Sequence, residues 1–108
     1  MTELPPVFAA ALDGRTIRMA NGEVLMIDKL NVPSVFAPAT QNEMILGLRA
    51  RERIQAMIDS SGPVEIHRGP TDDEGRIIVS IRIDNADIAA TMIAEGYGVA
   101  PGTLPFWD

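Results

Sequence analysis

The first thirty residues alternate between short apolar runs and turn signals. Asp13-Gly14 and Asn21-Gly22 separate the runs, and Asn-Gly is a strong hairpin signal because both residues tolerate positive φ. The middle run alternates apolar with polar residues, as a half-buried strand does. Pro33 follows the last run and ends it. The pattern predicts a three-stranded β-meander, with strands at residues 7–12, 16–19 and 23–30.

The pattern changes to a helical period after residue 40. Thr40 and Glu43 have the spacing of a capping box, in which each side chain accepts a hydrogen bond from the first-turn amide of the other. Ser60-Ser61-Gly62-Pro63 should stop the helix with a left-handed cap. We therefore expect a helix over residues 41–59. Its apolar stripe recurs at offsets of three and four, through Leu46, Ala50, Ile54, Met57 and Ile58.

Strand periodicity returns in the second half of the chain. Residues 64–68 alternate, residues 69–75 are typical of a polar turn, and residues 77–83 alternate again. After a turn at Asp84-Asn85, the pattern predicts a short helix over residues 87–95. The apolar side chains expected to line that helix are Ile88, Met92 and Ile93.

The resulting element order is β-β-β-α-β-β-α in a chain of 108 residues. This length fits one domain over residues 1–108, because domains most often have about 100 to 150 residues. Three meander strands, a long helix and two more strands are the order of a small, partly open Greek-key barrel. We expect a mainly β, α+β fold: a five-stranded barrel with the long helix at one end.

Composition and charge exclude several classes of function. The chain has no cysteine, which excludes disulfides, thiolate metal sites and cysteine catalysis. Its net charge of −6 lies entirely in residues 59–108 and argues against a general nucleic-acid binder, because affinity for phosphates comes from Lys and Arg. No apolar run approaches the roughly 18 residues of a membrane span, and a basic secretory signal is lacking. We expect a soluble, cytoplasmic protein without a membrane partner.

Several short motifs occur in the order that is typical of the thermonuclease family, also called staphylococcal-nuclease-like domains. The chain resembles this family from Val7 to Trp107. The resemblance implies a five-stranded barrel of the OB-fold type and calcium-assisted hydrolysis of phosphodiester bonds. The motifs that carry it are Asp13-Gly14-Arg15-Thr16, Asn21-Gly22-Glu23, Met26-Ile27-Asp28-Lys29-Leu30-Asn31-Val32-Pro33-Ser34, Asp72-Asp73-Glu74-Gly75-Arg76 and Glu95-Gly96-Tyr97-Gly98.

Most residues that carry this chemistry in the family are replaced here. The resemblance places its two metal-binding aspartates at Arg15 and Asn31. It places the glutamate that activates water at Ser34 and one phosphate-binding arginine at Met26, so that Arg76 is the only matched position. Arginine puts a fixed cation where a hard dication would bind, and asparagine supplies a carbonyl oxygen without charge. We therefore expect no calcium site, no cofactor and no useful nuclease activity.

Arg15 has two interpretations. In the first, its side chain is a built-in cation that replaces the metal, held by Asp13 or Asn31 and neutralising Asp13 or Asp28. In the second, it is a solvated turn residue. The sequence does not separate the two.

Arg76 has two interpretations as well. It is either a remaining phosphate contact or a strand-start arginine paired with Asp72 or Asp73, and the pairing is favoured because surface arginines commonly form such pairs. The acidic run around it lacks the alternate-position acids of a calcium loop. Glu74, which replaces a tyrosine of the family motif, adds a further anion there. We expect this run to be an exposed turn.

The remaining candidate residues have structural interpretations. Arg49, Arg51 and Arg53 point in different directions around a helix, which favours a solvated face over a basic patch. His67 has no second His or Cys nearby in the pattern, so we expect a structural or exposed role. Phe106-Trp107 is either an aromatic anchor for a partner or a segment folded back onto the domain.

Two functional hypotheses follow. The first is a non-catalytic member of the family, retained as a binding or interaction module whose partner is a protein or peptide in preference to nucleic acid. The second is a weak calcium-dependent nuclease with a displaced site, built from Asp13, Glu23 and Asp28. No familiar metal-ligand spacing supports the second.

Overall fold

The first half of the sheet is the predicted meander. The computed structural model describes residues 7–60 and 62–107. In the turn between the second and third strands of the meander, only Gly22 has a positive φ, of 93°. The Gly22 N–H donates to the Met19 carbonyl at 3.0 Å. The turn thus needs left-handed backbone at one residue, not at both. The three strands pair antiparallel in chain order and are somewhat shorter than predicted: β1 (Phe8–Ala11), β2 (Thr16–Met19) and β3 (Val24–Ile27).

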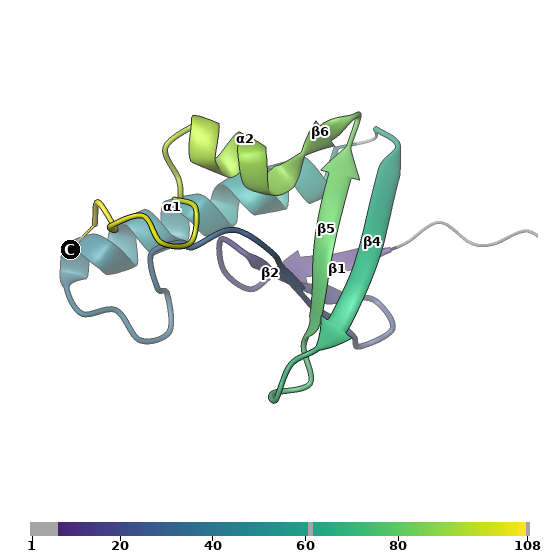
Figure 1. Cartoon of the computed structure of the whole chain (residues 1–108), viewed down its shortest axis with the longest axis horizontal. Helices are drawn as coiled ribbons and strands as arrows, with labels where there is room; N and C mark the ends of the chain where they lie inside the picture. The colour runs from purple at the N-terminus through teal and green to yellow at the C-terminus, as the bar shows by residue number, and fades with distance from the viewer. Residues whose placement is uncertain (1–6, 61, 108) are drawn as a thin grey trace, which may run out of the picture.

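Three further strands complete a six-stranded mixed sheet: β4 (Val64–Thr71), β5 (Ile77–Ile83) and β6 (Ala86–Asp87). The strand order is β1-β2-β3-β5-β4, with β6 beside β5. The β3–β5 pair is parallel and every other pair is antiparallel. In Figure 1, β4 and β5 cross the direction of the first three strands, so the sheet bends sharply where β3 meets β5.

The α+β class and the element order are confirmed, with β6 as an addition. β4 continues past its predicted end at residue 68, because pairing resumes between Thr71 and Ile77 after an irregularity that follows Arg68. The predicted turn at residues 69–75 is correspondingly shorter. The pairings of the described residues run from β1 to β4 and do not close the sheet into the expected barrel.

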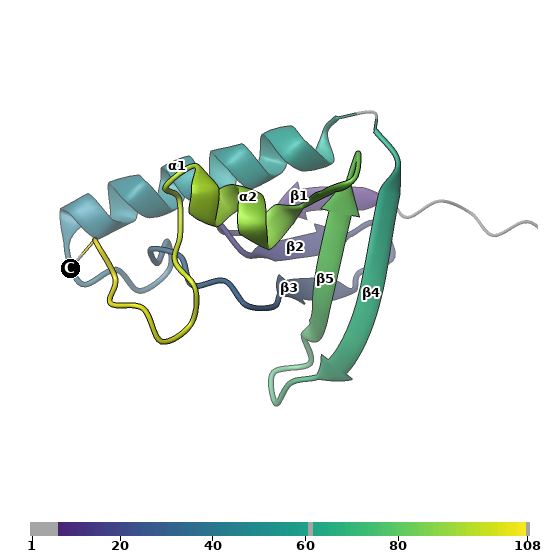
Figure 2. The same cartoon turned by 45° about the horizontal axis from the view of Figure 1, so that its top comes forward.

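Helix α1 (Gln41–Ile58) lies along the meander, as Figure 2 shows. The predicted stripe is confirmed at its centre, since the side chains of Ala50 and Ile54 are fully buried. Gln55 lies beside that stripe, and its Oε1 accepts the Ala11 N–H of β1 at 2.9 Å. This polar link between helix and sheet has no signature in the apolar pattern. The predicted left-handed stop includes Ser61, which lies outside the described residues.

Helix α2 (Ile88–Ala94) packs against β5. Ile88 and Met92 are buried as predicted, but Ile93 is 36% exposed and Ala89 is buried in its place. At about 100° per residue, position 92 lies between 88 and 89 on the inward face, while position 93 lies beyond 89 and has turned out of that face. The prediction for Ile93 is therefore wrong for a geometric reason.

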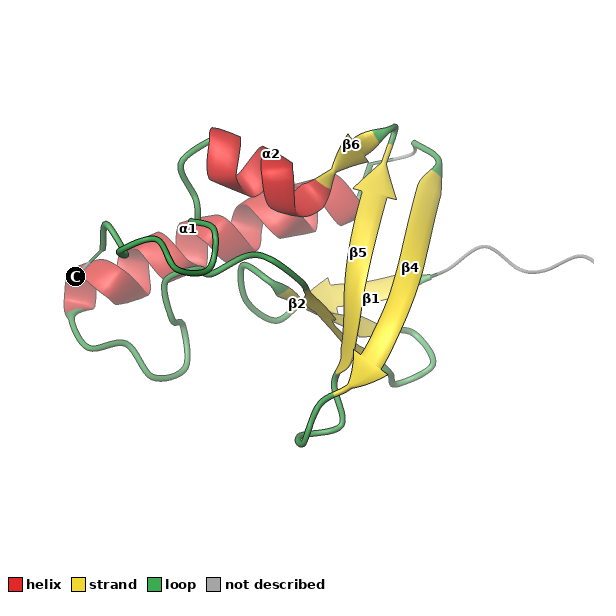
Figure 3. Ribbon diagram, in the orientation of Figure 1, coloured by secondary structure: helices red, strands yellow, loops and turns green. Residues whose placement is uncertain are grey.

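The core lies between the sheet and the two helices. Figure 3 shows the long loops gathered at the end of the domain where α1 begins. In that region Trp107 is only 7% exposed and meets Phe106 edge to face at 4.9 Å between ring centres. Trp107 thus folds back onto the domain, while Phe106 stays about half exposed. Neither helix of the described chain has the length and apolar character needed to cross a membrane.

Candidate functional site

The two positions that the resemblance assigns to metal-binding aspartates lie side by side. The Arg15 N–H donates to Asp13 Oδ1 at 2.8 Å in the turn that precedes β2. Asn31 follows β3 and exchanges two backbone hydrogen bonds with Val99, at 2.8 and 2.9 Å. Arg15 Nη1 donates both to Asn31 Oδ1 and to the Leu30 carbonyl oxygen, at 3.3 Å each. The guanidinium therefore joins the start of β2 to the chain that leaves β3.

This geometry confirms that Asn31 holds the Arg15 side chain. Among the described residues, Arg15 forms no ion pair, so the expected neutralisation of Asp13 or Asp28 is wrong. One carboxylate oxygen of each aspartate accepts a neighbouring backbone N–H instead, from Arg15 and Lys29 respectively. The Arg15 guanidinium instead contacts Leu30 and Asn31, which follow β3.

The residues present here do not fit a calcium ion. Calcium takes six to eight oxygen ligands, several of them usually carboxylates. At this place the Arg15 guanidinium already donates to the side-chain oxygen of Asn31 and to a neighbouring carbonyl. Within residues 7–60 and 62–107, no three His, Cys, Asp or Glu side chains are grouped so that they could hold a metal.

A buried carboxylate fixes the loop that contains Ser34. Glu43 is 8% exposed, and its two oxygens accept the N–H groups of Ser34 and Ala39 at 2.9 Å each. The hydrogen bonds from Ala39 and Ser34 lower the pKa of Glu43. Thr40 Oγ1 accepts the Glu43 N–H at 3.0 Å, which confirms half of the capping box, but Glu43 bonds loop amides in place of the cap amide. Both its oxygens are engaged, so Glu43 does not substitute for the base missing at Ser34.

The two positions assigned to phosphate-binding arginines lie on or beside neighbouring strands. Met26 is half-buried on β3, opposite Ile78 of β5, and offers no hydrogen-bond donor. Arg76 Nε donates to Asp72 Oδ2 at 2.8 Å, and the Arg76 N–H donates to Asp72 Oδ1 at 2.9 Å. Burial opposes ionisation of Asp72, but the bonds from Arg76 and the Glu74 N–H lower its pKa. The ion-pair interpretation of Arg76 is confirmed, and the acidic run is a turn that this pair closes.

The three acids of the displaced-site hypothesis do not gather around a common centre. Glu23 forms a two-pronged ion pair with Arg68, with both N–O distances 2.9 Å. Arg68 first, and Asn21 second, lower the pKa of Glu23. Asp13 and Asp28 each accept a backbone N–H beside them.

The other candidates are exposed or have a structural partner. Arg53 of α1 forms a two-pronged ion pair with Glu95, which caps α2, at 2.6 and 3.0 Å. The sequence pattern predicts a solvated face for the three helix arginines, but the Arg53 side chain links the two helices. The side chain of His67 is 62% exposed, with Nε2 3.1 Å from Glu65 Oε1, as expected for an exposed role.

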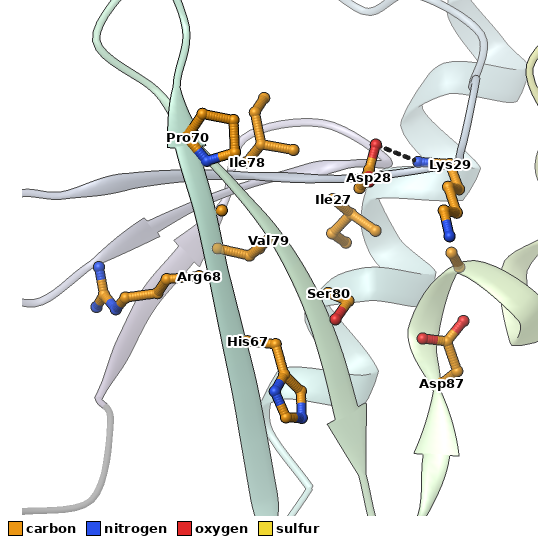
Figure 4. A pocket seen from close by; sticks show the side chains of 12 residues that line it. Ile27, Asp28, Lys29, His67, Arg68, Pro70, Ile78, Val79, Ser80 and Asp87 are labelled. Atoms are coloured by element: carbon orange, nitrogen blue, oxygen red, sulfur yellow. Dashed lines mark hydrogen bonds between the residues drawn. The ribbon is translucent and has the colours of Figure 1, made fainter.

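A groove of about 510 Å³ lies over the end of β3, strands β4 and β5, and the start of α2. Figure 4 shows Lys29 and Asp87 on one side of the groove and the apolar side chains of Ile78 and Pro70 on the other. Lys29 has a φ of 61°, a left-handed conformation that costs a residue with a side chain about 1 to 2 kcal/mol. Sequence reasoning missed this groove, because its residues come from separate segments and form no local motif.

The sequence matches no protein-family model and no curated protein. Membership of the thermonuclease family accordingly stays a prediction from the order of the motifs.

Proposed function

We propose that this protein is a staphylococcal-nuclease-like domain, with a barrel of the OB-fold type, that has lost the metal-binding and catalytic residues of its family. In this proposal it acts as a non-catalytic binding module for a protein or peptide. The order of the motifs and the confirmed α+β element order support the family assignment.

The contact between Arg15 and Asn31 carries the proposal. The resemblance implies that these positions hold the metal in the family, and here the cationic group of one donates to the side-chain oxygen of the other at 3.3 Å. A bound dication would meet a fixed positive charge at close range, which costs free energy in a partly buried place. Met26 and Ser34 remove two further groups that would stabilise charge or activate water.

The charge of the chain favours a protein or peptide over nucleic acid as the partner. A net charge of −6 repels phosphate backbones, whose binding depends on Lys and Arg. Of the matched residues, Arg76 is engaged with Asp72. The groove beside β4 and β5 offers a concave surface of about 510 Å³, within the usual range of about 300–1,000 Å³ for ligand sites.

Thermal unfolding with and without calcium and a nucleoside bisphosphate tests this function. A ligand that binds only the folded state raises the midpoint of unfolding. We expect neither addition, alone or together, to raise the midpoint above that measured with a chelator. Stabilisation that requires both ligands would contradict the proposal and favour the displaced-site nuclease.

A further inference from the structure

The groove beside β5 combines an apolar floor with a few polar side chains. Ile78 and Ser80 alternate on the outer face of β5, and His67 lies opposite Ser80 on β4. Asp87 closes the groove from β6, and Lys29 closes it from the chain after β3. In Figure 4 the Lys29 side chain extends in the direction of Asp87, although no ion pair joins them in the described part of the chain.

Most charged side chains that line the groove already form an ion pair or accept a hydrogen bond. Glu23 neutralises Arg68. Asp87 Oδ2 accepts the Ala90 N–H as the cap of α2, and Asp28 Oδ1 accepts the Lys29 N–H. These bonds leave one oxygen of each aspartate without a hydrogen bond from the described residues. The groove therefore has two carboxylates against the single cation of Lys29, in a chain whose net charge is −6.

The free edge of β4 is poorly suited to strand addition. It carries Pro70, which lacks an N–H, and its pairing with β5 is irregular between Arg68 and Thr71. Prolines and bulges are the usual means by which edge strands avoid pairing with another chain. A partner at this place is better recognised through its side chains than through its backbone.

We infer that this groove binds a lysine or arginine side chain of an extended partner peptide, an inference that rests on the proposed binding function. The aliphatic stem of such a side chain lies along the outer face of β5 in the direction of Ile78, as stems of basic residues do on apolar surfaces. Its cationic head lies at the free oxygen of Asp87. Pro70, on the other side of β5 from Asp87, meets a neighbouring residue of the peptide. A volume of about 510 Å³ exceeds that of one side chain, so neighbouring peptide residues enter the groove as well.

Lys29 provides a second test of the inference, because its removal should change the affinity in the direction opposite to removal of Asp87. Its charge repels a basic ligand and so limits the affinity of the groove. Removing the charge at Lys29 should strengthen binding, while removing the charge at Asp87 should weaken it. A groove built for an acidic ligand would show the reverse of both effects.

The test is a titration of isotope-labelled protein, followed by NMR, with a short blocked peptide of alternating lysine and valine. The matched probe has glutamate in place of lysine. We expect saturable shifts at the amides of Gly69, Ser80 and Asp87 with the lysine peptide only. Asp87→Asn keeps the cap of α2, because asparagine caps as well as aspartate, and should weaken binding about two- to fivefold. Lys29→Met should strengthen it by a similar factor.

Asp73→Asn is the matched control, because it removes the same charge from an exposed turn outside the groove. It should leave the affinity within error of the unchanged protein. Equal shifts with the glutamate peptide, equal losses in Asp73→Asn and Asp87→Asn, or no shifts at the groove amides would each overturn the inference. None of these results touches the proposed loss of catalysis, which the calcium and nucleotide scan decides separately.

Discussion

Nη1 of Arg15 lies 3.3 Å from Oδ1 of Asn31, so a guanidinium joins the turn before β2 to the chain after β3, at the two positions where the proposed resemblance to the thermonuclease family implies carboxylates. The same nitrogen donates to the Leu30 carbonyl at 3.3 Å. A permanent cation on the chain thus holds these two segments together.

Restoring carboxylates at the replaced positions should restore calcium binding. Arg15→Asp alone should lower the free energy of unfolding by about 1 kcal/mol or less, as for a partly exposed polar contact. Arg15→Asp combined with Asn31→Asp and Ser34→Glu puts a carboxylate at each of the three positions where the resemblance implies one, and such ligands bind calcium. Calorimetric titration of the triple variant should show calcium heat that the unchanged protein lacks.

Arg18→Asp is the control for the Arg15→Asp change, because Arg18 is an exposed residue of β2, the strand that Arg15 precedes. It makes the same change of charge as Arg15→Asp, and should neither bind calcium nor lose the Arg15 contact. A folded triple variant without calcium heat would mean that the geometry of the site has been lost together with its ligands.

Replacing Gly47 with alanine should destabilise the protein, although alanine is the better helix former. In an exposed helix interior, Gly→Ala stabilises by about 0.5 to 1 kcal/mol. A Cβ on Gly47 would lie 2.9 Å from the Ser34 carbonyl oxygen and 3.0 Å from that of Pro33, so α1 would have to move away from this loop. Overpacking of this kind costs about 1 to 3 kcal/mol.

Chemical denaturation of Gly47→Ala measures the effect, and Ala56→Gly on the exposed face of α1 measures propensity alone. We expect both variants to be less stable than the unchanged protein: Gly47→Ala because the added methyl group meets the loop, and Ala56→Gly because glycine is the poorer helix former. A gain of stability in Gly47→Ala would show that the loop yields to the added methyl group.

The fold was largely predictable from local signals. Alternation over residues 77–83 and the stripe through Ala50 and Ile54 each report on burial, which sequence pattern encodes directly. The extra pairing at Thr71 was not predictable, because it depends on how β4 passes an irregularity relative to β5. Ile93 was misplaced because every residue of the short helix except Thr91 is apolar, so the pattern does not define its inward face.

The candidate site was predictable only in part. Placing Arg15 beside Asn31 required the resemblance of the short motifs to those of the thermonuclease family, and the structure shows their contact. The partners of Glu43 were not predictable, since the capping-box pattern indicates a cap amide and the carboxylate instead bonds the loop at Ser34 and Ala39. Long-range partners of charged side chains leave no periodic signal in a sequence.

Glu43 should make stability depend on pH. Hydrogen bonds from Ala39 and Ser34 lower its pKa in the folded protein from an ordinary value of 4.5. Its contribution to stability is therefore fully present above that ordinary value, and is lost as the pH falls through the lowered pKa. Glu43→Gln should unfold at a lower temperature than the unchanged protein near neutral pH, and the difference should shrink at about pH 3.

Glu52→Gln on the exposed face of the same helix serves as the comparison for this effect and should change the midpoint little at either pH. A difference between Glu43→Gln and the unchanged protein that stays constant with pH would show that the ionised carboxylate is not what holds the loop.

A nuclease assay of the purified protein tests the loss of catalysis most directly. It measures hydrolysis of single-stranded DNA, duplex DNA and RNA, with calcium or with a chelator. Met26, Asn31 and Ser34 stand at positions where the proposed resemblance implies groups that supply charge or activate water, and Arg76 is bound to Asp72. We predict no hydrolysis in calcium beyond that seen with the chelator. Calcium-dependent hydrolysis that disappears in Arg76→Ala would contradict the account.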